Sequence, residues 1–217
     1  MTPFIMPQST AEPGPPPEPS RILVERFGRK VVPRAAKIHW PQRHPISYAL
    51  HYFPEGYPFK CVELGVYEGD HSFEMLKVLE PERLYLVDMW AEIPEEGKDY
   101  WEDNQEEWDR RYLSVVDRYA PFANVSVVRM PGDNAASIIP NDLDLVYIDA
   151  NHDYEPVLND MAKWLPKVRP GGIFSGDDYS RPQTAQAVVD FLKDYPQYQL
   201  QVSDNTTQWW FVKTACK

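Results

Sequence analysis

Acidic side chains stand at the ends of two strongly apolar segments of the chain. Asp149 closes the segment DLDLVYIDA (142–150), and Asp177 and Asp178 close GGIFSGDD (171–178). A carboxylate at the end of a buried segment is costly unless it is paired or bound to a cation. Magnesium, calcium and manganese are the natural ions for ligation by oxygen atoms alone. The pattern predicts a metal site, with helix capping or plain exposure of single aspartates as the alternative.

A histidine follows the first of these aspartates. His152 stands three residues after Asp149, close enough for the two side chains to face the same cavity. An imidazole can accept a proton near neutral pH, so it suits a general base.

Two glycines in ELGVYEGDHS (63–72) predict a tight turn at the end of the first apolar segment. Gly65 and Gly69 would let the backbone approach a ligand closely. The spacing is not G-x-G-x-x-G, so it does not favour a pyrophosphate cofactor. A turn with no ligand remains the alternative.

Another acidic residue, Asp88, ends the segment RLYLVDM (83–89). At the end of a second strand, a carboxylate is placed to accept hydrogen bonds from two ribose hydroxyls. A helix cap or a turn would use the same residue type. Trp90 would either stack on an adenine ring or pack in the core.

The elements that position these residues alternate between strands and helices. This order predicts an α/β fold: a Rossmann-like, seven-stranded, mostly parallel sheet with helices on both faces and a C-terminal antiparallel hairpin. Ligands bind at the carboxyl ends of parallel strands, where the residues above stand. The expected strands are 60–64, 83–89, 124–130, 142–150, 171–178, 197–203 and 207–213, and the expected helices are 71–79, 99–119, 154–168 and 183–194.

The composition of the chain argues against some classes of function. The chain has 217 residues and a net charge of -11, without the basic face of a nucleic-acid binder. It lacks an apolar run of about 18 residues and a signal-peptide pattern, so we expect a cytoplasmic location.

Residues 1–20 hold seven prolines and should form a disordered tail. Cys61 and Cys216 show no zinc-binding spacing, and a disulfide between them is not expected.

Taken together, the motifs resemble class I S-adenosylmethionine (SAM)-dependent methyltransferases. ELGVYEG, the acid after the second strand, LDLVYIDANHDYE and LPKVRPGGIFSGDDY are similar to the family-24 methyltransferase domain, related to catechol and caffeoyl-CoA O-methyltransferases. The resemblance covers about residues 60–213. We therefore expect three parts: the proline-rich tail at 1–20, an N-terminal cap segment at 21–59 and the methyltransferase domain at 60–217.

The resemblance also implies a role for each position. His152 takes the place of a catalytic lysine, with Asp149 as its catalytic partner, and Asp178 takes the place of a metal-binding asparagine. His71 stands where a small hydroxyl residue usually touches the SAM carboxylate, and residues 132–134 match the loop beside the adenine. The implied cofactor-binding residues are Glu63, Gly65, Tyr67, Gly69, His71, Asp88, Trp90, Asp133 and Asp149, and the implied metal ligands are Asp149, Asp177 and Asp178.

The implied function is SAM-dependent O-methylation of a small-molecule hydroxyl, assisted by a divalent metal, with magnesium expected. The implied partner is a small methyl acceptor rather than nucleic acid or a membrane, and a homodimer is left open. Two segments, 90–112 and 38–58, are candidates to wall the acceptor site and to cover the SAM site. A metal-independent methyltransferase, a non-catalytic SAM-fold binding protein and a nucleotide-sugar or NAD enzyme remain the alternatives.

Overall fold

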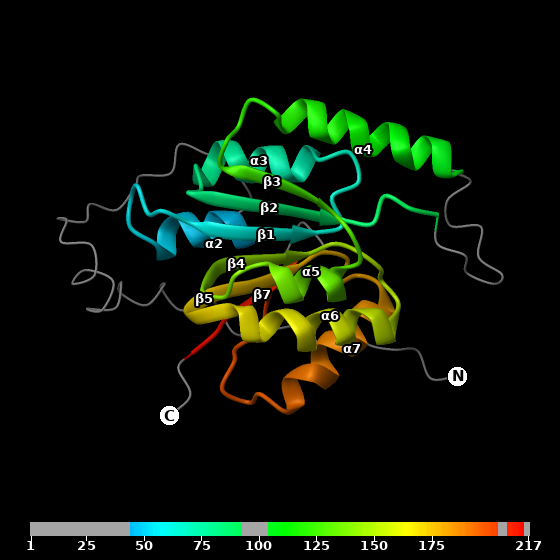
Figure 1. The fold of residues 1–217 in the computed structure, drawn as a ribbon. Coiled ribbons are helices and arrows are strands. Elements are labelled where there is room, and N and C mark those ends of the chain that lie inside the picture. Colours follow the sequence, from blue (N-terminus) through cyan, green and yellow to red (C-terminus); the bar gives the residue numbers. More distant parts are fainter. Residues whose placement is uncertain (1–43, 93–103, 204–207, 215–217) are drawn as a thin grey trace.

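The structure, a computed structural model, describes residues 44–92, 104–203 and 208–214. A twisted seven-stranded sheet of order β3-β2-β1-β4-β5-β7-β6 runs through its centre (Figure 1). Strands β1 to β5 pair in parallel, and β7 pairs antiparallel with both β5 and β6. The predicted fold is confirmed, including the C-terminal antiparallel pair. The strands are β1 (Lys60–Leu64), β2 (Arg83–Asp88), β3 (Val125–Arg129), β4 (Leu143–Ile148), β5 (Val168–Gly176), β6 (Gln201–Val202) and β7 (Trp209–Val212).

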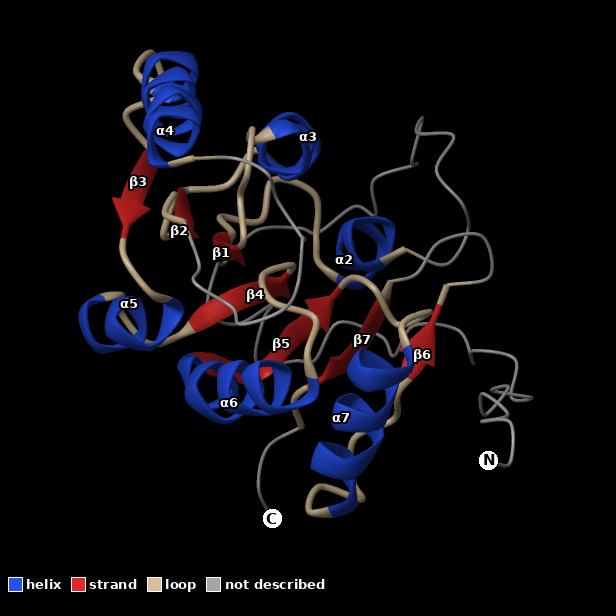
Figure 2. Cartoon of the chain, turned by 90° about the vertical axis from the view of Figure 1, so that its right-hand side faces the viewer, coloured by secondary structure: helices blue, strands red, loops and turns tan. Residues whose placement is uncertain are grey.

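Helices cover both faces of the sheet. Figure 2, which looks onto the carboxyl ends of the parallel strands, shows α2, α3 and α4 on one side and α5, α6 and α7 on the other. All six residues of β4 are buried, as expected for a central strand that is covered on both faces. The described helices are α2 (Pro45–Tyr52), α3 (Asp70–Leu79), α4 (Gln105–Tyr119), α5 (Gly132–Ile138), α6 (Tyr154–Trp164) and α7 (Pro182–Lys193).

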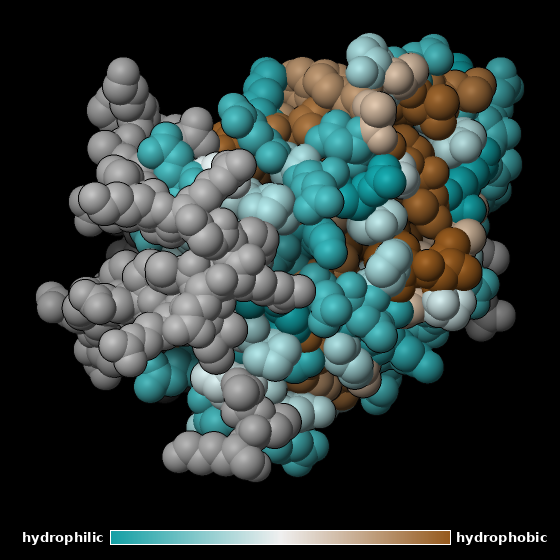
Figure 3. Space-filling view, turned by 60° about the vertical axis from the view of Figure 1, so that its left-hand side comes forward, coloured by the Kyte–Doolittle hydropathy of each residue, from teal (hydrophilic) through white to brown (hydrophobic). Residues whose placement is uncertain are grey.

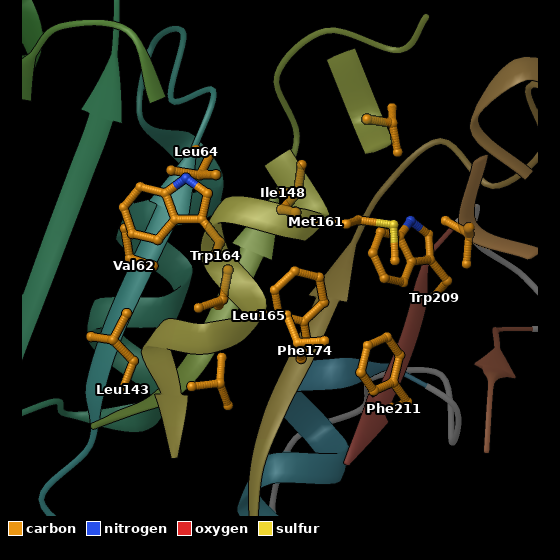
Figure 4. Packing of buried hydrophobic residues seen from close by; sticks show 14 of the residues in the cluster. Val62, Leu64, Leu143, Ile148, Met161, Trp164, Leu165, Phe174, Trp209 and Phe211 are labelled. Atoms are coloured by element: carbon orange, nitrogen blue, oxygen red, sulfur yellow. The ribbon is translucent and has the colours of Figure 1, made fainter. Parts of the chain in front are cut away.

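The core between the sheet and α5, α6 and α7 is built from large side chains. Met161 and Trp164 of α6 are fully buried in one cluster with Leu64 of β1 and Trp209 of β7 (Figure 4). Met161 and Trp164 lie at helical spacing on one side of α6, so this apolar stripe anchors the helix. This packing fixes the residues that precede α6, which include Asp149 and His152.

Several element boundaries differ from the prediction. The helix expected over 154–168 ends at Trp164, because a short 3-10 turn (Leu165–Lys167) leads directly into β5, which begins at Val168. Strand β6 has two residues rather than the seven expected, and α2 and α5 were not predicted.

None of the helices in the described part of the chain is both long and apolar enough to cross a bilayer. Figure 3 brings forward the side towards which the amino ends of the parallel strands point, where hydrophilic residues predominate among the coloured atoms. The proline-rich tail (1–20) lies outside the described residues.

Candidate functional site

A cleft of about 1240 Å³ opens at the carboxyl ends of the parallel strands. Most of the predicted site residues line it, although they come from four separate segments of the chain. A second cavity of about 240 Å³, beside the end of α2, contains none of them. The predicted residues that line the cleft are Glu63, Gly65, Tyr67, Gly69, His71, Asp88, Asp149, His152 and Asp178.

The first wall of the cleft is the loop between β1 and α3. Gly65 has a φ of +81°, and a Cβ on it would lie 1.9 Å from the backbone oxygen of Asp149. No side chain fits there, so glycine is required for the close approach of this loop to the end of β4. Tyr67, 37% exposed, also has a positive φ, of 52°. The loop therefore meets the end of β4 through backbone at Gly65, and Tyr67 lines the cleft beside it.

Asp88 holds this loop in place. Its Oδ2 accepts hydrogen bonds from the backbone N–H groups of Val66 (2.8 Å) and Tyr67 (2.9 Å), and its Oδ1 accepts one from Trp90 (2.8 Å). Oδ2 thus accepts two hydrogen bonds and Oδ1 only one, so Oδ1 can still accept a hydrogen bond from a ligand hydroxyl while the side chain orders the loop. The turn interpretation and the ribose interpretation of Asp88 are thus compatible.

Trp90 does not line the cleft. Its side chain is fully buried, and its Nε1 donates a hydrogen bond to the backbone oxygen of Tyr67 (2.8 Å). Its ring packs 5.3 Å from that of Tyr112. Of the two interpretations given for Trp90, the structure supports packing and not stacking on an adenine.

The buried side chain of Glu63, in β1, lies next to the side chain of His71, in α3. Glu63 is 1% exposed; its Oε1 lies 2.7 Å from Nδ1 of His71, and its Oε2 accepts a hydrogen bond from Ser72. Burial lowers the pKa of His71, but the charge and hydrogen bond of Glu63, together with the charges of Asp149 and Asp177, outweigh it, so the pKa is raised overall. The pair favours a protonated imidazole at the edge of the cleft. The ring of His71 lies 4.1 Å from that of Tyr147.

Three of the predicted polar residues form one cluster. Asp149, His152 and Asp178 each offer a ligand atom, and these atoms lie within 4.8 Å of one another. Nδ1 of His152 is 3.1 Å from Oδ2 of Asp178. Burial and the nearby charges of Asp177 and Glu63 raise the pKa of Asp149 to about 8. A carboxyl group in this environment is one whose charge a bound cation would stabilise.

The structure does not bring Asp177 into this cluster. Its Oδ1 accepts a hydrogen bond from the backbone N–H of Asp178 (2.8 Å), and its Oδ2 accepts one from the hydroxyl of Tyr147 (3.2 Å). Asp178, the next residue, has a φ of 56° and lines the cleft, whereas Asp177 does not. Asp177 therefore adds negative charge near the cluster without offering it a ligand atom.

Asp133 does not line the cleft either. Its side chain is exposed, and its Oδ1 accepts a hydrogen bond from Nδ2 of Asn159 (2.6 Å). The cleft wall at this end is formed instead by Gly132, Asn159 and Asp160. Asp160 was not predicted as a site residue from the sequence. It lies on the same side of α6 as Val157 and Trp164, and a carboxylate in such an apolar stripe is a signal that could have identified it.

The two candidate covering segments are only partly described. In the segment 90–112, residues 93–103 lie outside the described residues, and Trp108 lines the cleft. Of the segment 38–58, the described part does not line the cleft; His44 is buried and accepts a hydrogen bond from the backbone N–H of Ile46 at the start of α2.

The comparisons with known proteins agree with this geometry. The model of a methyltransferase-domain family, Methyltransf_24, matches residues 62–179. Among curated proteins, the uncharacterized protein R132 of Acanthamoeba polyphaga mimivirus is 37% identical over 60 residues, which cover 26% of this chain and 27% of that protein.

Solved structures share the fold at low sequence identity. The O-methyltransferase NovP has a TM-score of 0.56 and 21% identity, with 73% of each chain covered. A SAM-dependent O-methyltransferase from Thermotoga maritima has a TM-score of 0.52 and 11% identity, covering 74% of this chain and 61% of that one. An rRNA methylase from Streptococcus thermophilus also has a TM-score of 0.52, at 12% identity, covering 73% and 89%.

Proposed function

Because this chain belongs to the methyltransferase-domain family whose model it matches over residues 62–179, we propose that it transfers the methyl group of SAM to an oxygen atom of a small molecule, with the help of a divalent cation. We assign this activity to residues 60–217. The observation that carries the proposal is the cluster of Asp149, His152 and Asp178 at one side of the large cleft.

The proposed cofactor position follows the walls of the cleft. The β1–α3 loop, with its required glycine at position 65, would take the methionine part of SAM against its backbone. Asp88 would accept a hydrogen bond from a ribose hydroxyl at Oδ1, which receives only one hydrogen bond from the loop. His71, held by Glu63, would offer a positive charge to the carboxylate of SAM. Each of these assignments uses a residue that lines the cleft.

The residues of the cluster fit a divalent cation. Two carboxylates and one imidazole are ligand types that magnesium, manganese and zinc accept to different degrees. We assign the cation to Asp149 and Asp178, with magnesium as the expected ion, and we assign to Asp177 only a supporting negative charge. When bound, the cation would lower the pKa of an acceptor hydroxyl and orient its oxygen.

His152 would take the proton. With Nδ1 facing Asp178 at 3.1 Å, the other ring nitrogen, Nε2, is left to act as the base. The acceptor hydroxyl gives its proton to Nε2, its oxygen forms a bond to the methyl carbon, and the bond between that carbon and sulfur breaks to leave S-adenosylhomocysteine. The largest contribution of the protein is to hold the two reactants in line.

The direct test is methyl transfer from labelled SAM to catechols and hydroxylated sugars, with magnesium and after chelation. We expect turnover that chelation abolishes and added magnesium restores, and that falls more than about 100-fold in Asp149→Asn. His152→Ala should lose turnover but retain magnesium binding. Turnover that persists after chelation would contradict the metal-assisted mechanism. Methylation of ribosomal RNA in preference to every small molecule would contradict the proposed acceptor class.

A further inference from the structure

Arg181 stands at the edge of the large cleft, next to His152 and Asp178. It is the residue just before α7, and it lines the cleft together with Pro182 and Gln183. Among the described residues that line the cleft, it is the only arginine or lysine. Its side chain is 44% exposed, so a molecule in the cleft can reach the guanidinium group.

The carboxylate of Asp178 contacts both Arg181 and the proposed base. Its Oδ1 lies 3.3 Å from Nε of Arg181, and its Oδ2 lies 3.1 Å from Nδ1 of His152. Burial lowers the pKa of His152, the charge of Asp178 opposes this effect, and the charge of Arg181 lowers the pKa again. The guanidinium group therefore lies close to the place where the acceptor hydroxyl would give up its proton.

Arg181 has hydrogen-bond donors left for a ligand. A guanidinium group carries five N–H donors in a planar fork. The ion pair with Asp178 is the one side-chain polar interaction that Arg181 makes within the described part of the chain. Because the pair is partly exposed, it contributes little to stability by itself. The first turn of α7 holds no acidic residue that would compete for the guanidinium group.

From this arrangement we propose that Arg181 selects acceptors that carry a carboxylate group near the hydroxyl to be methylated. The inference rests on the proposed function and names its substrate class, a hydroxylated carboxylic acid. Two parallel N–H groups of a guanidinium match the two oxygens of a carboxylate. The proposed cation would offset the charges of Asp149 and Asp178, so these two acids would not repel an anionic acceptor.

The test compares acceptors that differ in one charged group. One pair is protocatechuate, a catechol with a carboxylate, and the alcohol in which a hydroxymethyl group replaces that carboxylate; the other pair is glucuronate and glucose. The values of kcat and KM are measured for each acceptor with labelled SAM and magnesium. The proteins are the full chain as wild type, Arg181→Gln, Arg181→Lys and Arg110→Gln.

Arg110→Gln is the matched control. Arg110 forms an ion pair of the same spacing, with Glu107 three residues earlier in the chain (3.0 Å), but it does not line the cleft.

We expect the wild type and Arg110→Gln to show a KM for the acid of each pair that is about tenfold lower than for its neutral partner. Arg181→Gln should lose this preference because its KM rises for the acid alone. Arg181→Lys should retain part of it, since lysine keeps the charge without the planar fork.

A wild type that prefers the neutral acceptors, or an unchanged preference in Arg181→Gln, would overturn the inference. Equal losses for both members of a pair in Arg181→Gln would also overturn it, because Arg181 would then act only by supporting Asp178. If the wild type methylates none of these acceptors, the proposed function itself fails, and this inference fails with it.

Discussion

The backbone oxygen of Asp149 lies where a side chain on Gly65 would have to be, 1.9 Å from an ideal Cβ. This contact joins the loop after β1 to the end of β4, so it sets the distance between the proposed SAM loop and the proposed metal cluster. The two halves of the site are therefore connected through a backbone contact rather than through a side chain.

Gly65→Ala should separate these two halves. The added methyl group collides with backbone, which cannot move aside as a flexible side chain would, so we expect a loss of stability well above 1 kcal/mol and of SAM binding. Gly56→Ala is the matched control: Gly56 has a similar φ of +72° but nothing within 4 Å, so it should cost only about 1 kcal/mol. Chemical denaturation of both variants measures the difference, and equal losses would contradict the role of the close approach.

Glu63→Gln should lower the pKa of His71. The acid raises this pKa by its charge and its hydrogen bond, against the opposing effect of burial. Removing the charge of Glu63 leaves only Asp149 and Asp177 to oppose the effect of burial, so the imidazole should become neutral at a lower pH. Titration of the His71 ring protons by NMR in both proteins measures the shift. The same pKa in wild type and variant would show that Glu63 does not control the charge of His71.

The two neighbouring aspartates should respond differently to magnesium. Asp178→Asn removes a carboxylate of the cluster, and we expect magnesium binding to weaken more than about tenfold. Asp177→Asn changes a group whose oxygens are bonded to Tyr147 and to the backbone of Asp178, so we expect a smaller loss. Calorimetric titration with magnesium ranks them, and a larger loss in Asp177→Asn would restore Asp177 as a ligand.

The buried acid in α6 predicts a pH dependence of stability. The pKa of Asp160 rises from an ordinary value near 4 in the unfolded chain to about 7 in the folded one. The folded state therefore holds this proton more tightly, and its stability falls as pH rises from about 4 to 7. Asp160→Leu removes this contribution, so it should gain stability relative to wild type across that window. A stability difference that is constant with pH would contradict the raised pKa.

Much of the fold was predictable because its signals are local. The strand at 60–64 was predicted with its observed bounds, and the apolar run around β4 gave a central strand, because burial on both faces leaves no polar position. The helix α5 was missed because GDNAASI is short and has little apolar periodicity. The end of α6 depended on where β5 begins, which long-range pairing with β4 decides.

The sequence predicted which strand ends carry the site residues, but it did not predict the direction in which each side chain points. Parallel pairing brings Asp88, Asp149 and Asp178 to one edge of the sheet, as their positions after apolar segments indicated. Which of two adjacent aspartates faces the cleft depends on the left-handed backbone at Asp178. Trp90 is buried and donates a hydrogen bond to the backbone oxygen of Tyr67, a contact between loops that the spacing of residues does not reveal.

The central claim is that the cleft binds SAM beside a divalent cation. Isothermal titration of the full chain with SAM, with magnesium present and after chelation, tests it most directly, with Asp149→Asn titrated in parallel. The account predicts SAM binding in every case and a separate magnesium heat that Asp149→Asn loses. Absence of SAM binding under all conditions would contradict the claim, and a magnesium heat unchanged in Asp149→Asn would remove the cation from this site.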